Sequence, residues 1–195
     1  GGGSSDSTGD TGDNTFTVGG SISGLTGTLV LRLNDTYDLT VTTNGSYKFS
    51  TTFDSEITYS VSVLTQPTSP DHQECQISNA SGTTSAGVTN ISIVCYTLTP
   101  YYFSGYDADK GWELFVSYGT EELTFLVKDI EDGTGDSDPQ FFHDAGDYHL
   151  FSADDSVNGR ELWMTDGTEE GTKLVKDIYA GASNHSYPEQ FLTIG

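Results

Sequence analysis

The chain has 195 residues and a formal net charge of −22, from 29 acidic and 7 basic side chains. The basic residues are scattered and form no stripe that would neutralise phosphates, so we expect no nucleic-acid partner. No apolar run approaches the ~18 residues of a membrane helix, and short β-branched and aromatic runs cut by Gly and Asn predict an all-β protein.

The N-terminal residues 1–14 carry no apolar side chain and are rich in Gly, Ser and Asp. This composition predicts a flexible, solvated leader or tether. The stretch resembles the tether that follows the lipidated cysteine of bacterial outer-membrane lipoproteins. That resemblance implies a location at the bacterial outer-membrane surface or secretion, with the lipidated cysteine directly before Gly1. An engineered linker would have a similar composition.

Residues 15–98 contain short alternating apolar runs about ten residues apart, separated by turn signals such as Asn44-Gly45. This spacing predicts a two-sheet β-sandwich of immunoglobulin-like type. The GLTGTLVL start and the VTNISIVC end also resemble a module of bacterial exported proteins. The resemblance implies a spacer or stalk unit that carries no chemistry of its own.

Two cysteines fall inside this first domain. Cys75 and Cys95 are each in phase with neighbouring isoleucines, so both side chains should point toward the apolar face. An even cysteine count in an apparently exported chain predicts a disulfide between them. Two buried free thiols in a cytosolic protein are the alternative.

From Pro100 onward the sequence repeats itself at an offset of 48 residues, which becomes 49 after one insertion. Four short strands are expected in each copy, the size of one β-propeller blade. We therefore expect two blades, at about 99–147 and 148–195. The repeated segments are Phe103-Ser104 with Phe151-Ser152, Glu113-Leu114-Phe115 with Glu161-Leu162-Trp163, Gly119-Thr120 with Gly167-Thr168, 126–130 with 174–178, and 139–142 with 188–191.

The second copy contains ELWMTDGT at residues 161–168. This stretch resembles the ELWxxDGT repeat family of exported bacterial proteins, which implies a β-propeller built from many such units. In the turn, the Asp166 carboxylate can accept backbone N–H bonds and Gly167 can take a positive φ. The residues expected to build the repeat are Glu113, Leu114 and Phe115 in the first copy, and Glu161, Leu162, Trp163, Asp166, Gly167 and Thr168 in the second.

The first copy departs from the family pattern, with Phe115, Tyr118 and Leu123 in place of Trp163, Asp166 and Gly171. Such a departure suits a terminal repeat. Two blades do not close a propeller, which needs about four. We therefore expect further repeats to follow, or another chain to complete the open edge.

Two acidic loops and one histidine cluster are candidate metal sites. The loops offer hard oxygen ligands of the kind that Ca²⁺ requires, although neither has the EF-hand spacing, and carboxylates that cap turns are the alternative. The cluster of His143, Asp144, Asp147 and His149 has ligands for a transition metal or a base with an orienting acid, or consists of surface loop side chains. The candidate Ca²⁺ ligands are Asp132, Asp136, Asp138, Asp154, Asp155 and Asn158.

The sequence has no nucleophile elbow, phosphate-binding glycine loop or HExxH motif. We therefore expect a non-enzymatic extracellular or cell-surface binding or scaffold protein that presents a β-propeller to a protein or glycan partner. Ca²⁺ is the one cofactor that the sequence suggests. The alternatives are a propeller-based carbohydrate-active enzyme and a structural subunit of an envelope assembly or filament. In the last case the open edge at residues 180–195 would pair with a neighbouring chain.

Overall fold

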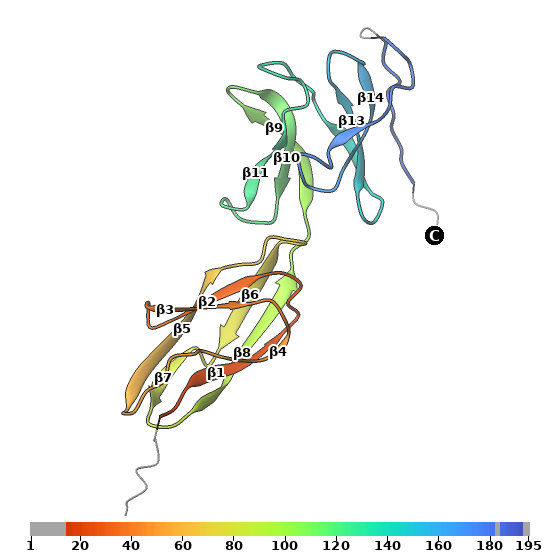
Figure 1. The fold of residues 1–195 in the computed structure, drawn as a ribbon. Coiled ribbons are helices and arrows are strands. Elements are labelled where there is room, and N and C mark those ends of the chain that lie inside the picture. Colours follow the sequence, from red (N-terminus) through yellow and green to blue (C-terminus); the bar gives the residue numbers. More distant parts are fainter. Residues whose placement is uncertain (1–14, 182–183, 193–195) are drawn as a thin grey trace, which may run out of the picture. The chain divides into compact units, whose positions relative to one another are not determined.

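The computed structural model describes residues 15–181 and 184–192, and the predicted leader at 1–14 lies outside these ranges. In the described residues the secondary structure consists of fifteen strands and no helix, so the prediction of an all-β protein is confirmed. The chain divides into two compact units, residues 1–98 and 99–195. Figure 1 labels the strands of both units.

Unit 1 consists of two four-stranded sheets. All neighbouring strands are antiparallel except β1 and β8, which run parallel. The first sheet has the order β4-β1-β8-β6, with β1 at Val18–Ser23, β4 at Gly45–Lys48, β6 at Gln73–Ser78 and β8 at Val88–Thr97. The second has the order β3-β2-β5-β7, with β2 at Leu29–Leu33, β3 at Tyr37–Val41, β5 at Ile57–Thr65 and β7 at Ser81–Thr84.

Both sheets of unit 1 contribute side chains to one apolar core. The alternation of β2 explains its share, because Leu29, Leu31 and Leu33 all point to one face and are fully buried. From the other sheet, Ile91 and Ile93 of β8 are buried in the same cluster. Each of these side chains stabilises the fold by roughly 1.5–3 kcal/mol through burial.

The predicted disulfide is present. Cys75 in β6 and Cys95 in β8 lie directly opposite one another in adjacent strands of the same sheet. Their Cα atoms are 3.9 Å apart, and both side chains are buried, at 4% and 5% exposure. The bond closes a loop with a sequence separation of 20, and it therefore restricts the unfolded chain around β7.

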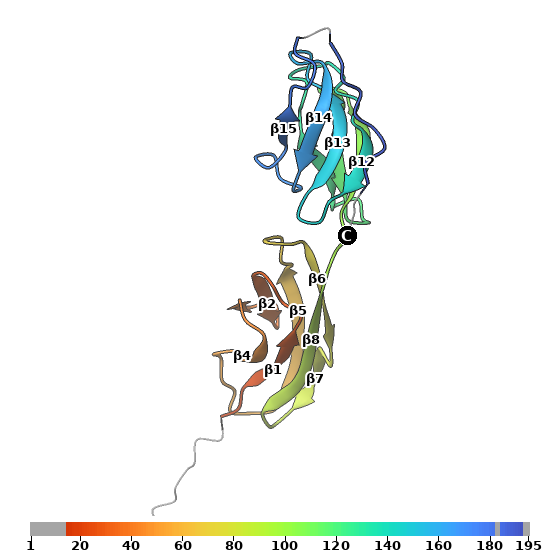
Figure 2. The same ribbon diagram turned by 90° about the vertical axis from the view of Figure 1, so that its right-hand side faces the viewer.

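Unit 2 consists of a three-stranded and a four-stranded antiparallel sheet. The four-stranded sheet is best seen in Figure 2. The first sheet has the order β11-β10-β9, with β9 at Tyr101–Asp107, β10 at Gly111–Ser117 and β11 at Thr124–Lys128. The second has the order β12-β13-β14-β15, with β12 at Gln140–Asp144, β13 at His149–Asp154, β14 at Arg160–Thr165 and β15 at Lys173–Lys176.

The two sequence copies fold alike. Phe103 lies opposite Phe115 in the first sheet, and Phe151 lies opposite Trp163 in the second, at the same register. The register shift between Leu114 and Phe115 in β10 also recurs at the equivalent place in β14. The 48-residue repeat is therefore a repeat of structure as well as of sequence.

The sheets do not follow the predicted blade boundary at residue 147. Strand β12 comes from the first sequence copy, yet it pairs with β13 of the second. The short hairpin that Ala145 and Tyr148 close with a backbone hydrogen bond explains this pairing. In the equivalent C-terminal segment, residues 188–192 form no strand in the structure.

The core of unit 2 lies between its two sheets. One face of the first sheet and one face of the second bury their apolar side chains against each other. Directly opposite residues of an antiparallel pair have their side chains on the same face of the sheet. The strand registers therefore show which residues lie on the inner face. The first sheet contributes Tyr102, Leu114 and Val116, and the second contributes Phe151, Ala153 and Trp163.

We expect the double replacement Cys75→Ala and Cys95→Ala to lower the free energy of unfolding of unit 1 by about 3 kcal/mol, because the unfolded chain regains loop entropy. Urea denaturation followed by far-UV circular dichroism measures this loss. Both tryptophans lie in unit 2, so tryptophan fluorescence serves as the internal control and should give an unchanged transition. An equal shift in both signals would contradict the prediction.

Candidate functional site

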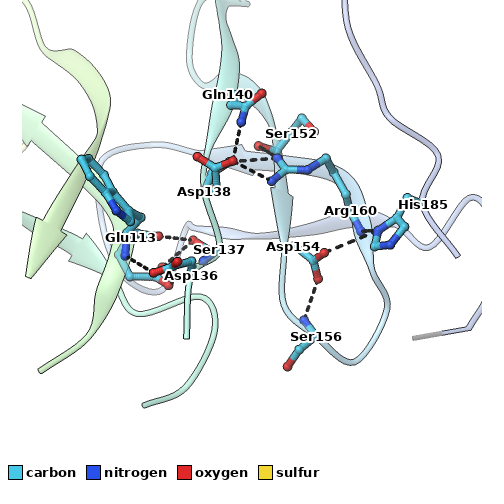
Figure 3. Close-up of polar contacts among 11 residues, drawn as sticks. Glu113, Asp136, Ser137, Asp138, Gln140, Ser152, Asp154, Ser156, Arg160 and His185 are labelled. Atoms are coloured by element: carbon cyan, nitrogen blue, oxygen red, sulfur yellow. Dashed lines mark hydrogen bonds and ion pairs between the residues drawn. The ribbon is translucent and has the colours of Figure 1, made fainter. Parts of the chain in front are cut away.

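The glutamate of each repeat is a buried structural acceptor. Glu113 in β10 accepts hydrogen bonds from the backbone of Ile130 at 2.8 Å and from the backbone and hydroxyl of Ser137 at 3.1 and 2.6 Å. It is completely inaccessible to solvent. Figure 3 shows Glu113 and Ser137 pointing toward each other. One carboxylate therefore ties β10 to the exit of β11 and to the segment that leads into β12.

The second copy repeats this arrangement. Glu161 accepts hydrogen bonds from the backbone of Ile178 at 2.9 Å and from the backbone and hydroxyl of Ser186 at 3.1 and 2.6 Å. Each donor lies one repeat after its counterpart in the first copy. The glutamate of the motif thus has a structural partner set in both copies, which places it in the architecture and not at a solvent-facing site.

Burial raises the pKa of Glu113 above its ordinary value of 4.5, and the hydrogen bonds from Ser137 and from the backbone partly offset this effect. A carboxyl group with a raised pKa in the folded state binds its proton more tightly there than in the unfolded chain. Its ionisation therefore lowers the stability of the fold as the pH rises.

The DGT turn between β14 and β15 is held by its own side chains. Asp166 accepts hydrogen bonds from the backbone and the hydroxyl of Thr168 at 2.9 and 2.7 Å, while Gly167 takes a φ of 91°. The hydroxyl of Thr168 in turn accepts the N–H of Gly171 at 2.9 Å. The hydrogen bond from the Thr168 side chain is the main cause that lowers the pKa of Asp166.

The departures of the first copy in this turn are coupled. The Asp166 carboxylate occupies the space where a Cβ of residue 171 would lie, so a side chain at this position would displace the aspartate from its place in the turn. The first copy has Tyr118 in place of the aspartate and Leu123 in place of the glycine. It still keeps the hydrogen bond from the N–H of Leu123 to the Thr120 hydroxyl at 3.3 Å. The two substitutions therefore belong together.

Arg160 joins the two sequence copies. Its guanidinium donates to the carbonyl of Asp138 at 2.8 Å and lies 3.3 Å from the carboxylate of the same residue. Gln140 donates to that carboxylate at 2.5 Å. Figure 3 shows the side chains of Asp138, Gln140 and Arg160 gathered at this junction. The salt bridge fixes the entry of β12 into the second sheet.

The candidate Ca²⁺ ligands do not converge. Within residues 15–181 and 184–192, no group of three or more His, Cys, Asp and Glu side chains could hold a metal ion. Asp132 acts electrostatically on Lys110. Asp136 accepts from Trp112 N and so joins its loop to β10. The others act in turns or in the Arg160 junction: Asp138 accepts from Arg160 and Gln140, Asp154 from Ser156 N, and Asp155 from Asn158 N and Nδ2. The structure thus gives the Ca²⁺ prediction no support.

The histidine cluster is likewise part of local structure. Asp144 accepts a hydrogen bond from the N–H of Gly146 at 2.8 Å. The ring of His149 lies 4.6 Å from that of Tyr102, between their centroids, and burial is the largest cause that lowers the pKa of His149. His149 therefore packs against the first sheet of unit 2.

One surface feature was missed by the sequence analysis. Tyr106 and Trp112 lie directly opposite each other in β9 and β10, with ring centroids 5.7 Å apart and planes inclined at 55°. They are 64% and 46% exposed. The second copy has Asp154 and Arg160 at the equivalent positions. Two aromatic residues flanking segment 107–111, which contains the turn at 108–110, were the sequence signal for this pair.

Comparison of the chain with protein-family models, with curated proteins and with solved structures found no match. The resemblance to the ELWxxDGT repeat family therefore rests on the motif alone. In the part of the chain that the structure describes, no helix is long and apolar enough to cross a membrane.

We expect Gly171→Leu to destabilise unit 2 by about 1–3 kcal/mol, because the added side chain overlaps the Asp166 carboxylate. Adding Asp166→Tyr recreates the pair of the first copy and should recover part of that loss, a coupling of roughly 0.5–3 kcal/mol. Urea unfolding of the wild type, both single variants and the double variant, followed by tryptophan fluorescence, measures the coupling. Strict additivity would show that the two positions are independent.

The raised pKa of Glu113 predicts the pH dependence of one variant. The stability advantage of the wild type over Glu113→Gln should be largest below about pH 4.5 and should fall as the pH rises through the raised pKa. Denaturant unfolding of both proteins at about pH 4 and pH 7 measures the difference, with Glu122→Gln as the exposed control. An advantage that grows with pH would mean that the hydrogen bonds to the ionised carboxylate outweigh its burial.

Proposed function

We propose that this protein is a non-enzymatic extracellular or cell-surface scaffold and binding protein. In this proposal unit 1 is an immunoglobulin-like spacer, and unit 2 presents β-propeller-type blades to a partner. The leader would act as a tether, with a lipid anchor at its start. The partner we propose is a neutral glycan, although a protein would use the same surface.

The sheet arrangement supports the architectural part of this proposal. Unit 1 has two four-stranded sheets around one core, as a sandwich requires. Its disulfide lies within one sheet, whereas that of antibody domains joins the two sheets. In unit 2, the four-stranded antiparallel sheet packed on an equivalent sheet supports the blade assignment.

The disulfide also supports the proposed location. A disulfide bond persists in oxidising compartments and is rare in the cytosol. The buried bond between Cys75 and Cys95 is therefore consistent with export. The resemblance of residues 1–14 to a lipoprotein tether points the same way.

The exposed pair of Tyr106 and Trp112 is the observation that carries the binding proposal. Tyrosine and tryptophan side chains bury a large area on contact and carry a polar group at the ring edge, which suits the mixed apolar and hydroxylated faces of a sugar. Asp107 ends β9 and Asp109 lies in the turn that follows, and their carboxylates can accept hydrogen bonds from sugar hydroxyls. The net charge of −22 would repel an anionic glycan, so we propose a neutral one.

We expect Trp112→Ala to weaken binding of a neutral oligosaccharide about tenfold, a loss of roughly 1.4 kcal/mol. A glycan array screened with the wild type identifies the probe, and calorimetry then compares the variants. Tyr179→Ala serves as the matched control, because Tyr179 is also exposed but lies outside the pair. Unchanged affinity in Trp112→Ala would overturn the site, and release of shortened sugar products would favour the carbohydrate-active enzyme instead.

A further inference from the structure

The first sheet of unit 2 has one strand fewer than the second. In the second sheet, β12 covers the edge of β13. The equivalent edge in the first sheet belongs to β9, which has no partner on that side among the described residues. Residues 101–106 of β9 carry no charged side chain. An unpaired edge strand whose charge is confined to its last residue, here Asp107, readily accepts another strand.

The C-terminal segment has the backbone shape of the missing strand. Asp138 and Phe141, which lead into and begin β12, take positive φ angles of 43° and 59°. The residues one repeat later, Tyr187 and Gln190, take positive φ angles of 49° and 60°. Segment 187–192 thus reproduces the bends of β12, although it joins no sheet in the structure.

The side chains of this segment also match the vacant edge. In the second sheet, Phe142 of β12 stacks on Phe151 with ring centroids 5.6 Å apart, and Phe151 is fully buried. Phe191 is the equivalent of Phe142 one repeat later, and Phe103 is the equivalent of Phe151 one repeat earlier. Both are half-buried. The same stacking contact would cover both rings.

The outer faces of the two sheets could pack against each other in the way that the inner faces do. Inside unit 2 the first sheet packs against the second, and the two faces that meet are not repeat equivalents of each other. The apolar side chains of both faces are buried. The outer face of each sheet carries the repeat equivalents of these residues, and they are half-buried. On the first sheet these are Phe103 and Phe115, and on the second they are Leu150, Leu162 and Met164.

We propose that unit 2 binds a second copy of the chain head to tail, with segment 187–192 of one copy added to β9 of the other. The interior pairing sets the register. Gln140 lies opposite Ser152 and His143 opposite Leu150. By the repeat, Glu189 of one copy lies opposite Ser104 of the other, and Leu192 opposite Tyr102. Such a heterologous contact generates rings or filaments, and it does not depend on glycan binding.

Cysteine pairing between two variants tests the register. Directly opposite residues of antiparallel strands lie within disulfide distance. Glu189→Cys mixed with Ser104→Cys under oxidised glutathione should give a covalent dimer, in larger yield than either variant alone. Val157→Cys mixed with Ser104→Cys is the matched control, because Val157 is exposed in a loop outside the contact. Equal yields in the two mixtures would overturn the proposal.

The oligomeric state of the unmodified chain provides the second test. Sedimentation velocity over a concentration series should show a mass that rises above the monomer. Phe191→Asp should abolish this rise, because it places a charge against Phe103, while Val157→Asp should leave it unchanged. Near-UV circular dichroism confirms that both variants stay folded. A wild-type chain that stays monomeric at every concentration, or a Phe191→Asp variant that associates like the wild type, would refute the head-to-tail contact.

Discussion

The buried glutamate of each repeat is the interaction on which unit 2 depends. Glu113 and Glu161 are fully buried, and each accepts hydrogen bonds from two later segments of the chain. Burying a carboxyl group without partners is strongly unfavourable. The residues just after the third strand of each repeat and the loop that follows are therefore held at fixed positions around the two carboxylate oxygens. In the first copy that loop leads into β12 of the second sheet. The glutamate therefore fixes the connection between the two sheets.

The other residues of the motif also make structural contacts. The turn residues Asp166, Gly167 and Thr168 satisfy one another, and Trp163 is buried against the first sheet. The exposed aromatic pair at Tyr106 and Trp112 lies outside the motif, at positions that the second copy fills with other residues. In this protein the repeat builds the scaffold, and the proposed binding surface comes from what is not repeated.

Local patterns in the sequence predicted the all-β class and the disulfide of unit 1. Alternation identified the strands of unit 1 except β7 at Ser81–Thr84, which contains no apolar residue. The phase of Cys75 and Cys95 predicted their disulfide. The fixed offset of 48 residues predicted equivalent environments for Phe115 and Trp163, and their strand registers agree. The pairing of β12 with the next copy could not be predicted from the repeat. A periodic sequence does not show at which residue each structural unit begins, so β12 could belong to the preceding or the following sheet. The acidic loops were equally ambiguous, since an aspartate that caps a turn and one that binds an ion have the same local signature.

The position of β12 has a consequence for how such a chain can change in length. Because the complete second sheet takes its strands from two successive sequence copies, neighbouring copies are interlocked and no copy is an independent module. A deletion of one full period keeps the strand order of the sheets wherever it starts, whereas a deletion of any other length breaks it. Duplication during evolution therefore needs no particular breakpoint, and only the length of the inserted or deleted segment is constrained.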